Sequence, residues 1–290
     1  MKSALIPMPD FPTLVRLSSF YFFYFGTLGV IVPYWGPYLS ARGLSAVDIG
    51  TLFAVLNGTK IVSPYVWGWI GDQIGNRVRI IRLATMVAML TFAAVLIPWG
   101  YYWLLFLTVI YSFFWNACLP QFEAITLGHL KGAPGRYSRV RLWGSVGFII
   151  SVLGVGYLID VLSIKQVPYV ALGMFVALWL ISRLVTDHGG SPDEGEQGSL
   201  REVIFRREVI AFFVVYFFLQ ASHGPFYAFY TLFLEQAGYE HKVIGVLWSV
   251  GVVAEIMVFL WISKLFDRFE PHKLLVGALV LGVFRWSIVG

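Results

Sequence analysis

Nine long apolar runs divide this chain of 290 residues, and each is close to the length that a helix needs to cross a membrane. About 20 residues, rising 1.5 Å each, span the ~30 Å of hydrocarbon in a bilayer. Only 13% of the chain is charged, against about 25% in a soluble domain, and 58% is hydrophobic. We therefore expect an all-α membrane protein with helices at 15–39, 46–70, 80–99, 102–127, 141–162, 167–185, 209–234, 244–265 and 274–290.

The basic residues fall mainly in the links on one side of these helices. Sixteen of the 21 lie on the side of the N-terminus, and three, Arg42, Lys165 and Lys242, lie on the other. Because Lys and Arg accumulate in cytoplasmic loops, we predict a cytoplasmic N-terminus in a bacterial inner membrane. Topology thus accounts for the net charge of +5, and no nucleic-acid partner is expected.

The sequence lacks the motifs that would indicate an enzyme or a metal site. Cys118 is the single cysteine, which excludes a disulfide framework and a cysteine-based metal cluster. The sequence also has no HExxH motif, no nucleophile elbow and no clustered metal ligands. We expect neither an enzyme nor a bound cofactor or metal.

One long polar link, rich in Gly, Ser, Pro and acidic residues, separates the sixth apolar run from the seventh. Such a segment buries too little apolar surface to fold alone. We predict a six-helix bundle at 1–185, a cytoplasmic linker at 186–208 and a partial second bundle of three helices at 209–290.

The chain also repeats itself after 195 residues. Residues 43–72 match residues 238–267 at both ends, where Gly43 corresponds to Gly238 and Asp72 to Asp267. Parallel repeats of six helices characterise one large class of transporters. A complete second half would need three more helices, so we expect nine of twelve, in a chain truncated at its C-terminal end.

The link between the second and third runs carries a motif, Gly68-Trp-Ile-Gly-Asp72-Gln-Ile-Gly75-Asn-Arg77-Val-Arg79. It resembles the G-x-x-x-D-R-x-G-R-R signature of the major facilitator superfamily, with Gln73 and Asn76 in place of two basic residues. The resemblance implies a loop that controls the rocking of two bundles, through Gly68, Asp72, Gly75 and Arg77.

Further patches are similar to the galactoside and phenylpropionate permease group of proton symporters within that superfamily. Pro120-Gln-Phe-Glu123-Ala and Arg139-Val-Arg141-Leu-Trp-Gly144 match its P-x-x-E-A and R-x-R-x-x-G patterns. The resemblance implies that Glu123 and Arg141 grip the substrate, and that Glu255 couples it to protons beside Arg285. The seventh run departs from the galactoside pattern, since no acidic residue lies between Glu208 and Glu235.

Ionisable residues inside the apolar runs mark a transport pathway independently of any resemblance. Each costs at least about 2.5 kcal/mol at bilayer depth, so it faces a partner or a wet cavity. Lys60 and Glu255 are related by the shift of 195 and are predicted to face each other across a cavity. The predicted substrate residues are Lys60, Glu123, Arg141 and Arg285, and the predicted proton-coupling residues are Glu255 and His223.

Each of these residues also has a structural interpretation. For Lys60 it is a lysine whose stem reaches the inner headgroups, and for Glu123 with Arg141 it is a stabilising pair near the interface. His223 is equally well a neutral histidine bonded to a carbonyl as a proton relay.

Counting these charges leaves one excess positive charge, which suits a monoanion, and 51 aromatic residues supply rings to sandwich another ring. We therefore expect a proton-coupled symporter of a small organic acid, of the aromatic, phenylpropionate-like kind, working as a monomer when full length. A sugar or nucleoside symporter is the alternative within the fold, and a truncated membrane scaffold that does not transport is the alternative outside it.

Overall fold

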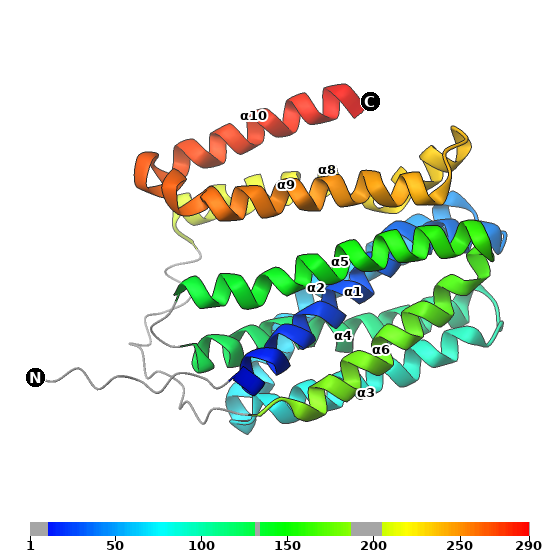
Figure 1. Cartoon of the computed structure of the whole chain (residues 1–290), viewed down its shortest axis with the longest axis horizontal. Coiled ribbons are helices and arrows are strands. Elements are labelled where there is room, and N and C mark those ends of the chain that lie inside the picture. Colours follow the sequence, from blue (N-terminus) through cyan, green and yellow to red (C-terminus); the bar gives the residue numbers. More distant parts are fainter. Residues whose placement is uncertain (1–10, 131–133, 187–204, 290) are drawn as a thin grey trace, which may run out of the picture. The chain divides into compact units, whose positions relative to one another are not determined.

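The computed structural model describes residues 11–130, 134–186 and 205–289. The described residues form helices and contain no strand, which confirms the expected all-α class (Figure 1). The long helices are α1 (Phe11–Ala41), α2 (Ala46–Ile74), α3 (Arg77–Ala93), α4 (Tyr101–His129), α5 (Pro134–Val161), α6 (Val167–Leu184), α8 (Arg207–Gln236), α9 (His241–Arg268) and α10 (Pro271–Val289). Two short 3₁₀ turns follow α3 and α5, at Ala94–Leu96 and Ile164–Gln166.

Each predicted apolar run coincides with one of these helices. Eight of the helices within the described residues are long and apolar enough to cross a membrane, and α10 is the one outside that set. The run predicted at 80–99 ends early, because Ile97 is extended and Pro98 follows it. A residue before proline is disfavoured in the helical region, so the chain leaves the helix there.

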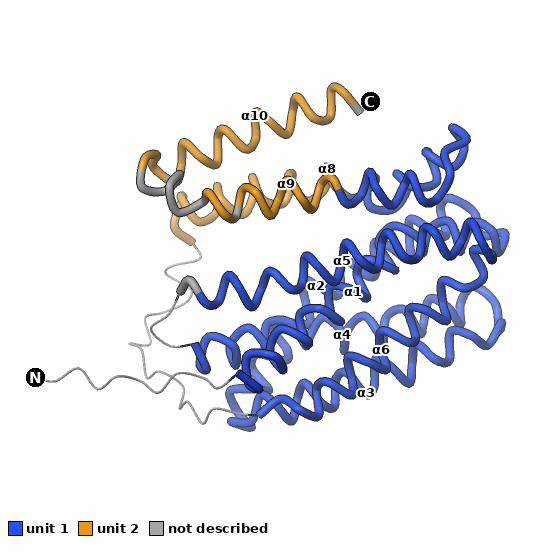
Figure 2. The backbone as a smooth tube through the Cα atoms, in the orientation of Figure 1, with its two compact units in different colours: residues 1–197, 224–249 blue, residues 198–223, 250–290 orange. Residues whose placement is uncertain are grey.

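The first compact unit holds α1 to α6 together with residues 224–249 (Figure 2). Within it α1 packs along α5 and α6, while α4 packs against α2 and α3. Glycines let α1 and α5 approach closely: a Cβ on Gly29 would lie 2.6 Å from the carbonyl oxygen of Phe148. Small residues of this kind are the usual means of helix packing in lipid, where apolar burial drives little association.

Large aromatic side chains fill the core of this unit. The ring of Phe92 lies 4.9 Å from that of Phe175 and 5.2 Å from that of Tyr111, and Trp115 lies 5.4 Å from Phe175. All four side chains are fully buried. Edge-to-face and tilted contacts such as these connect α3, α4 and α6.

The turns at Gly43 and Gly238 reproduce the repeat in atomic detail. Both glycines have positive φ, 84° and 85°. The N–H of Gly43 donates to Ser40 at 2.8 Å, and the N–H of Gly238 donates to Glu235 at 2.9 Å. The next residue in each turn, Leu44 or Tyr239, donates to a carbonyl five residues earlier. The 195-residue repeat is therefore a repeat of backbone geometry as well as of sequence.

The second compact unit holds residues 198–223 and 250–290, which include the start of α8, the end of α9 and α10. Residues 187–204, most of the predicted linker, lie outside the described residues. The division into bundles at 186–208 therefore stays a prediction.

Candidate functional site

The strongest cluster of predicted site residues lies between α4 and α5, around Arg141. Its Nε lies 4.0 Å from Oε1 of Glu123, which is an ion pair too long to be a hydrogen bond. The two side chains are 28% and 36% exposed. A loose pair of this kind leaves both charged groups able to engage a third group.

Aromatic rings surround the same guanidinium. Its central carbon lies 3.9 Å from the centre of the Phe25 ring and 5.5 Å from that of Tyr21, both on α1. The hydroxyl of Tyr137 donates to Oε1 of Glu123 at 3.5 Å. The sequence did not single out Phe25, Tyr21 or Tyr137, because nothing local distinguishes them from the other aromatic residues of the chain.

Gly144 makes room for this arrangement. A Cβ at this position would lie 2.7 Å from the ring of Phe25 and 2.9 Å from Nη1 of Arg141. The glycine of the R-x-R-x-x-G pattern therefore has a steric role, since any side chain would push the guanidinium off the ring.

The hydrogen bond of Lys60 is with its own helix and not with the residues around Arg141. Its Nζ donates to Oδ1 of Asn57 at 3.1 Å on the same helix, and its side chain is exposed. The preceding residue, Thr59, accepts a hydrogen bond from Asn116 at 2.9 Å and so connects α2 to α4. Lys60 and Glu255 belong to different compact units, so their predicted matching across a cavity stays a prediction.

His223 and Arg285 come together within the second unit. Nη1 of Arg285 lies 3.2 Å from Nε2 of His223, and its guanidinium carbon lies 4.8 Å from the Trp286 ring centre. An arginine only donates, so Nε2 is the acceptor, and Nδ1 carries the proton that it donates to the carbonyl of Leu219 at 2.8 Å. The bond to Leu219 is the carbonyl contact that the structural interpretation of His223 describes, and its part in proton coupling stays a prediction.

Glu255 lies on α9 in the same unit, with an exposed side chain. No hydrogen bond or ion pair joins it to another described residue. Its predicted part in proton coupling stays a prediction.

The motif between α2 and α3 forms a compact polar junction. Arg77 Nη2 lies 3.0 Å from Oδ1 of Asp72, and Arg77 Nη1 donates to Gln121 of α4 at 3.0 Å. Gly75 ends α2 with φ of 65°, a conformation that favours glycine. A Cβ on Gly68 would meet open space, whereas one on Gly71 would lie 3.0 Å from Gln121, so Gly71 is the glycine of close approach.

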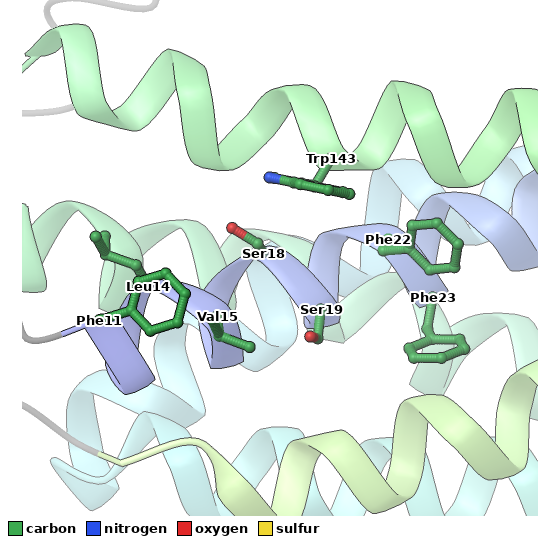
Figure 3. A pocket seen from close by; sticks show the side chains of 8 residues that line it. All are labelled: Phe11, Leu14, Val15, Ser18, Ser19, Phe22, Phe23 and Trp143. Carbon is green, nitrogen blue, oxygen red and sulfur yellow. The ribbon is translucent and has the colours of Figure 1, made fainter.

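A groove of about 440 Å³ lies beside α1, and none of these charged residues lines it. Its lining is apolar apart from two hydroxyls, and Trp143 of α5 faces it across from α1 (Figure 3). The lining residues are Phe11, Leu14, Val15, Ser18, Ser19, Phe22, Phe23 and Trp143. None is a predicted substrate residue, and a groove without a charge does not suit an organic acid.

Comparisons with known proteins agree with the architecture. A model of the MFS_1-like family matches residues 14–290. The protein named "Probable 3-phenylpropionic acid transporter" of Escherichia coli K12 is 29% identical over 281 residues, covering 94% of this chain and 73% of that protein. The maltose permease of Geobacillus stearothermophilus is 26% identical, covering 92% and 68%.

Solved structures show the same fold at lower identity. Two crystal structures of the nucleoside transporter NupG, 17% and 18% identical, superpose with TM-scores of 0.77 and 0.75. Both matches cover 89% of this chain, and 69% and 68% of the matched chains. These relatives are named as transporters or permeases rather than as enzymes.

Proposed function

This chain belongs to the MFS_1-like family of major facilitator transporters, and from that membership we propose that it carries a small aromatic carboxylate together with protons. The chain is an integral membrane protein of helical bundles. The proposed mechanism is alternating access, in which two bundles rock around a central site.

The surroundings of Arg141 carry the proposal. A guanidinium offers two parallel donors to a carboxylate, a bidentate geometry that a lysine does not reproduce. Here it is loosely paired with Glu123 and stacked on Phe25. A substrate carboxylate would replace Glu123 as the partner of Arg141, while its ring would pack among the aromatic side chains of α1.

Arg285 is the second proposed cation for the substrate, and His223 is its proposed link to protons. The lone pair on Nε2 of His223 accepts from Arg285. A proton arriving on that nitrogen would remove the acceptor and place two cations side by side. Protonation would therefore break this hydrogen bond and turn Arg285 toward an anion.

Glu255 is proposed as the main proton carrier, and Lys60 as the group that orients the substrate. A protonated carboxyl crosses the membrane interior at far lower cost than a carboxylate. Proton binding at Glu255 would therefore allow the loaded bundles to rock without exposing an unpaired charge to lipid.

A nucleoside or sugar is the second candidate cargo. Its support is the superposition on NupG and the match to a maltose permease. Aromatic rings stack on a nucleobase or a sugar as well as on a phenyl group, so the charge on Arg141 is the feature that separates the candidates.

Uptake by cells that express the protein tests the proposal. Radiolabelled 3-phenylpropionate should accumulate, and unlabelled thymidine or maltose should not compete. Arg141→Gln should lower kcat/KM by about 30-fold or more, since a charge-assisted hydrogen bond to the substrate carboxylate is lost. Arg141→Lys should recover part of this loss, and Arg139→Gln, an exposed arginine two residues earlier, should change little.

Normal uptake of 3-phenylpropionate by Arg141→Gln would disprove the assigned site. Uptake of thymidine or maltose in place of the acid would establish the second candidate.

A further inference from the structure

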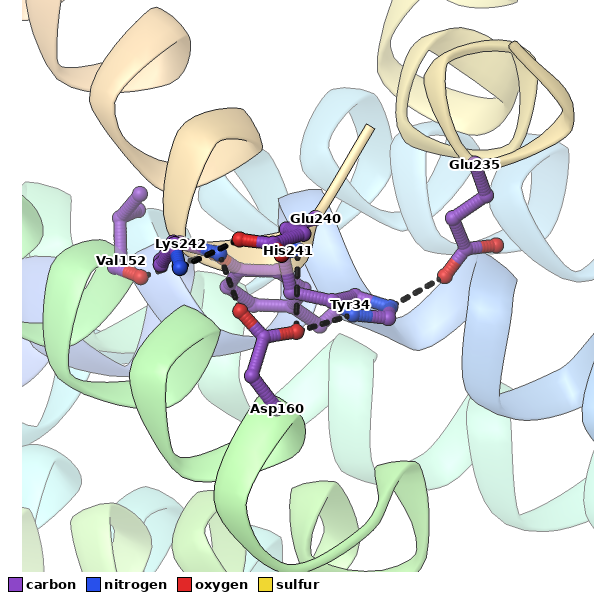
Figure 4. A network of polar contacts seen from close by, with 7 residues as sticks. All are labelled: Tyr34, Val152, Asp160, Glu235, Glu240, His241 and Lys242. Atoms are coloured by element: carbon purple, nitrogen blue, oxygen red, sulfur yellow. Dashed lines mark hydrogen bonds and ion pairs between the residues drawn. The ribbon is translucent and has the colours of Figure 1, made fainter. Parts of the chain in front are cut away.

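The N-terminus of α9 takes its cap from another helix. Asp160, in the last turn of α5 and 81 residues earlier, accepts the backbone N–H of His241 at 3.1 Å and that of Lys242 at 2.9 Å (Figure 4). The first N–H groups of a helix have no partner within it, and a carboxylate there also suits the helix dipole.

The equivalent end of α2 needs no such help. There Ser45 and Asp48 form a capping box, in which each side chain bonds the backbone N–H of the other. The positions related by the 195-residue repeat are Glu240 and Val243. Val243 cannot accept a hydrogen bond through its side chain, so this half of the repeat has lost the box and relies on Asp160.

The ring of His241 joins this cap to a third helix. Nδ1 lies 2.8 Å from Oδ1 of Asp160, and Nε2 lies 2.6 Å from Oε1 of Glu235 near the end of α8. A carboxylate only accepts hydrogen bonds, so a ring that serves two carboxylates donates from both nitrogens. That ring is the cationic form of histidine, and its two bonds are charge-assisted.

The backbones of α5 and α9 are in direct contact at the same place. A Cβ on Gly156 would lie 2.5 Å from the carbonyl oxygen of His241, and one on Gly245 would lie 3.0 Å from that of Val152. The hydroxyl of Tyr34 on α1 donates to Val152 at 2.8 Å. The polar cluster of Asp160, Glu235 and His241 therefore lies where the backbones of α5 and α9 are closely packed.

We propose that Asp160, Glu235 and His241 form an outer latch that holds the ends of α5, α8 and α9 together while His241 is protonated. The name follows the sequence prediction that this end faces outside. The inference rests on the proposed alternating access, because a carrier must separate the first bundle from α8 and α9 at this end to admit substrate from outside.

The sign of the pH dependence follows from the hydrogen bonds. While His241 is protonated and both carboxyl groups are ionised, both ring nitrogens donate and the latch is complete. As pH rises through the titration of His241, one donor is lost and one carboxylate faces a lone pair. The other charged or titratable groups next to the latch are Lys242, which pairs with Glu240, and Tyr34.

Distance measurement between spin labels tests the latch without any substrate. Cysteines replace Leu162 and Tyr239, which are 60% and 49% exposed, in a protein whose Cys118 is changed to alanine. In nanodiscs, Asp160→Asn should raise the fraction of long distances about tenfold, because a charge-assisted contact is lost. Glu240→Gln, which removes a carboxylate one residue before His241, should leave the distribution unchanged.

A pH titration of the labelled protein with an intact latch gives a second measurement that needs no unstable variant. The fraction of long distances should rise with pH, and His241→Gln should remove most of that rise. A distribution insensitive to both pH and Asp160→Asn would overturn the latch even if 3-phenylpropionate were carried. Shifted distances without uptake of the acid would contradict the proposed function and leave the latch standing.

Discussion

Arg141 and Gly144 form one steric unit, one turn apart on α5, and this unit sets how the guanidinium meets the Phe25 ring. Gly144→Ala should raise KM for the proposed acid substrate about tenfold, because a methyl group would displace a charge-assisted contact by ~1 Å. Uptake kinetics over a range of substrate concentrations would show the change.

The matched control is Gly154→Ala, on the same helix, where a Cβ would meet nothing within 4 Å. Equal kinetics in the two variants would contradict the steric role of Gly144.

At the scale of single residues, part of the candidate site could be predicted from the sequence and part could not. Glu123 and Arg141 were predicted as a pair because each is an isolated charge at similar depth on neighbouring helices, and the structure brings them together. Phe25 and Tyr137 escaped prediction, since 51 aromatic residues carry no local signal of which ones face a cation. The sequence left His223 open between a proton relay and a histidine bonded to a carbonyl, and it could not show that Arg285 lies against the ring.

The turn between α8 and α9 corresponds, through the 195-residue repeat, to the turn between α1 and α2, and variants of the two turns can be compared. Gly238→Ala should lower the free energy of unfolding by about 1 kcal/mol, because a side chain is disfavoured at positive φ. Gly43→Ala should cost a similar amount, since the two turns share φ and hydrogen bonds. Thermal unfolding of purified protein would measure both.

The control here is Gly251→Ala, inside α9, where a Cβ has open space. This variant should be neutral or slightly stabilising, as alanine favours helix over glycine. A Gly238→Ala protein as stable as the parent would show that the turn relaxes at no cost.

The helices themselves were predictable because length and hydropathy fix them locally. Every predicted run corresponds to one helix. The run at 80–99 was predicted to end too late, because the effect of Pro98 on the residue before it was not taken into account. What the sequence could not supply was the cap on α9, because the partner, Asp160, is 81 residues before His241. Contacts between residues so far apart in the sequence depend on how the helices pack, and the hydrophobic periodicity of the sequence does not predict that packing.

The proposed proton coupling would be a property of the molecule as a whole. Accumulation of the proposed substrate, 3-phenylpropionate, should collapse when an uncoupler is added. Glu255→Gln should abolish concentrative uptake while leaving exchange of labelled for unlabelled acid. Exchange needs no net movement of charge or proton, so it isolates coupling from binding. Vesicles with an imposed pH gradient would measure both activities.

Glu270→Gln is the control. Glu270 lies just before α10 and pairs with His272 and Lys273 in the first turn of that helix, outside the expected pathway. Normal concentrative uptake by Glu255→Gln would remove Glu255 from the coupling mechanism.

The cap that α5 supplies to α9 bears on the order in which the protein is built. Synthesis runs from the amino-terminal end, and early segments fold first. The carboxylate of Asp160 is therefore in place at the membrane surface before His241 leaves the ribosome. The first turn of α9 is then completed against a carboxylate that was made before it, so the order of synthesis favours the pairing of this helix with α5.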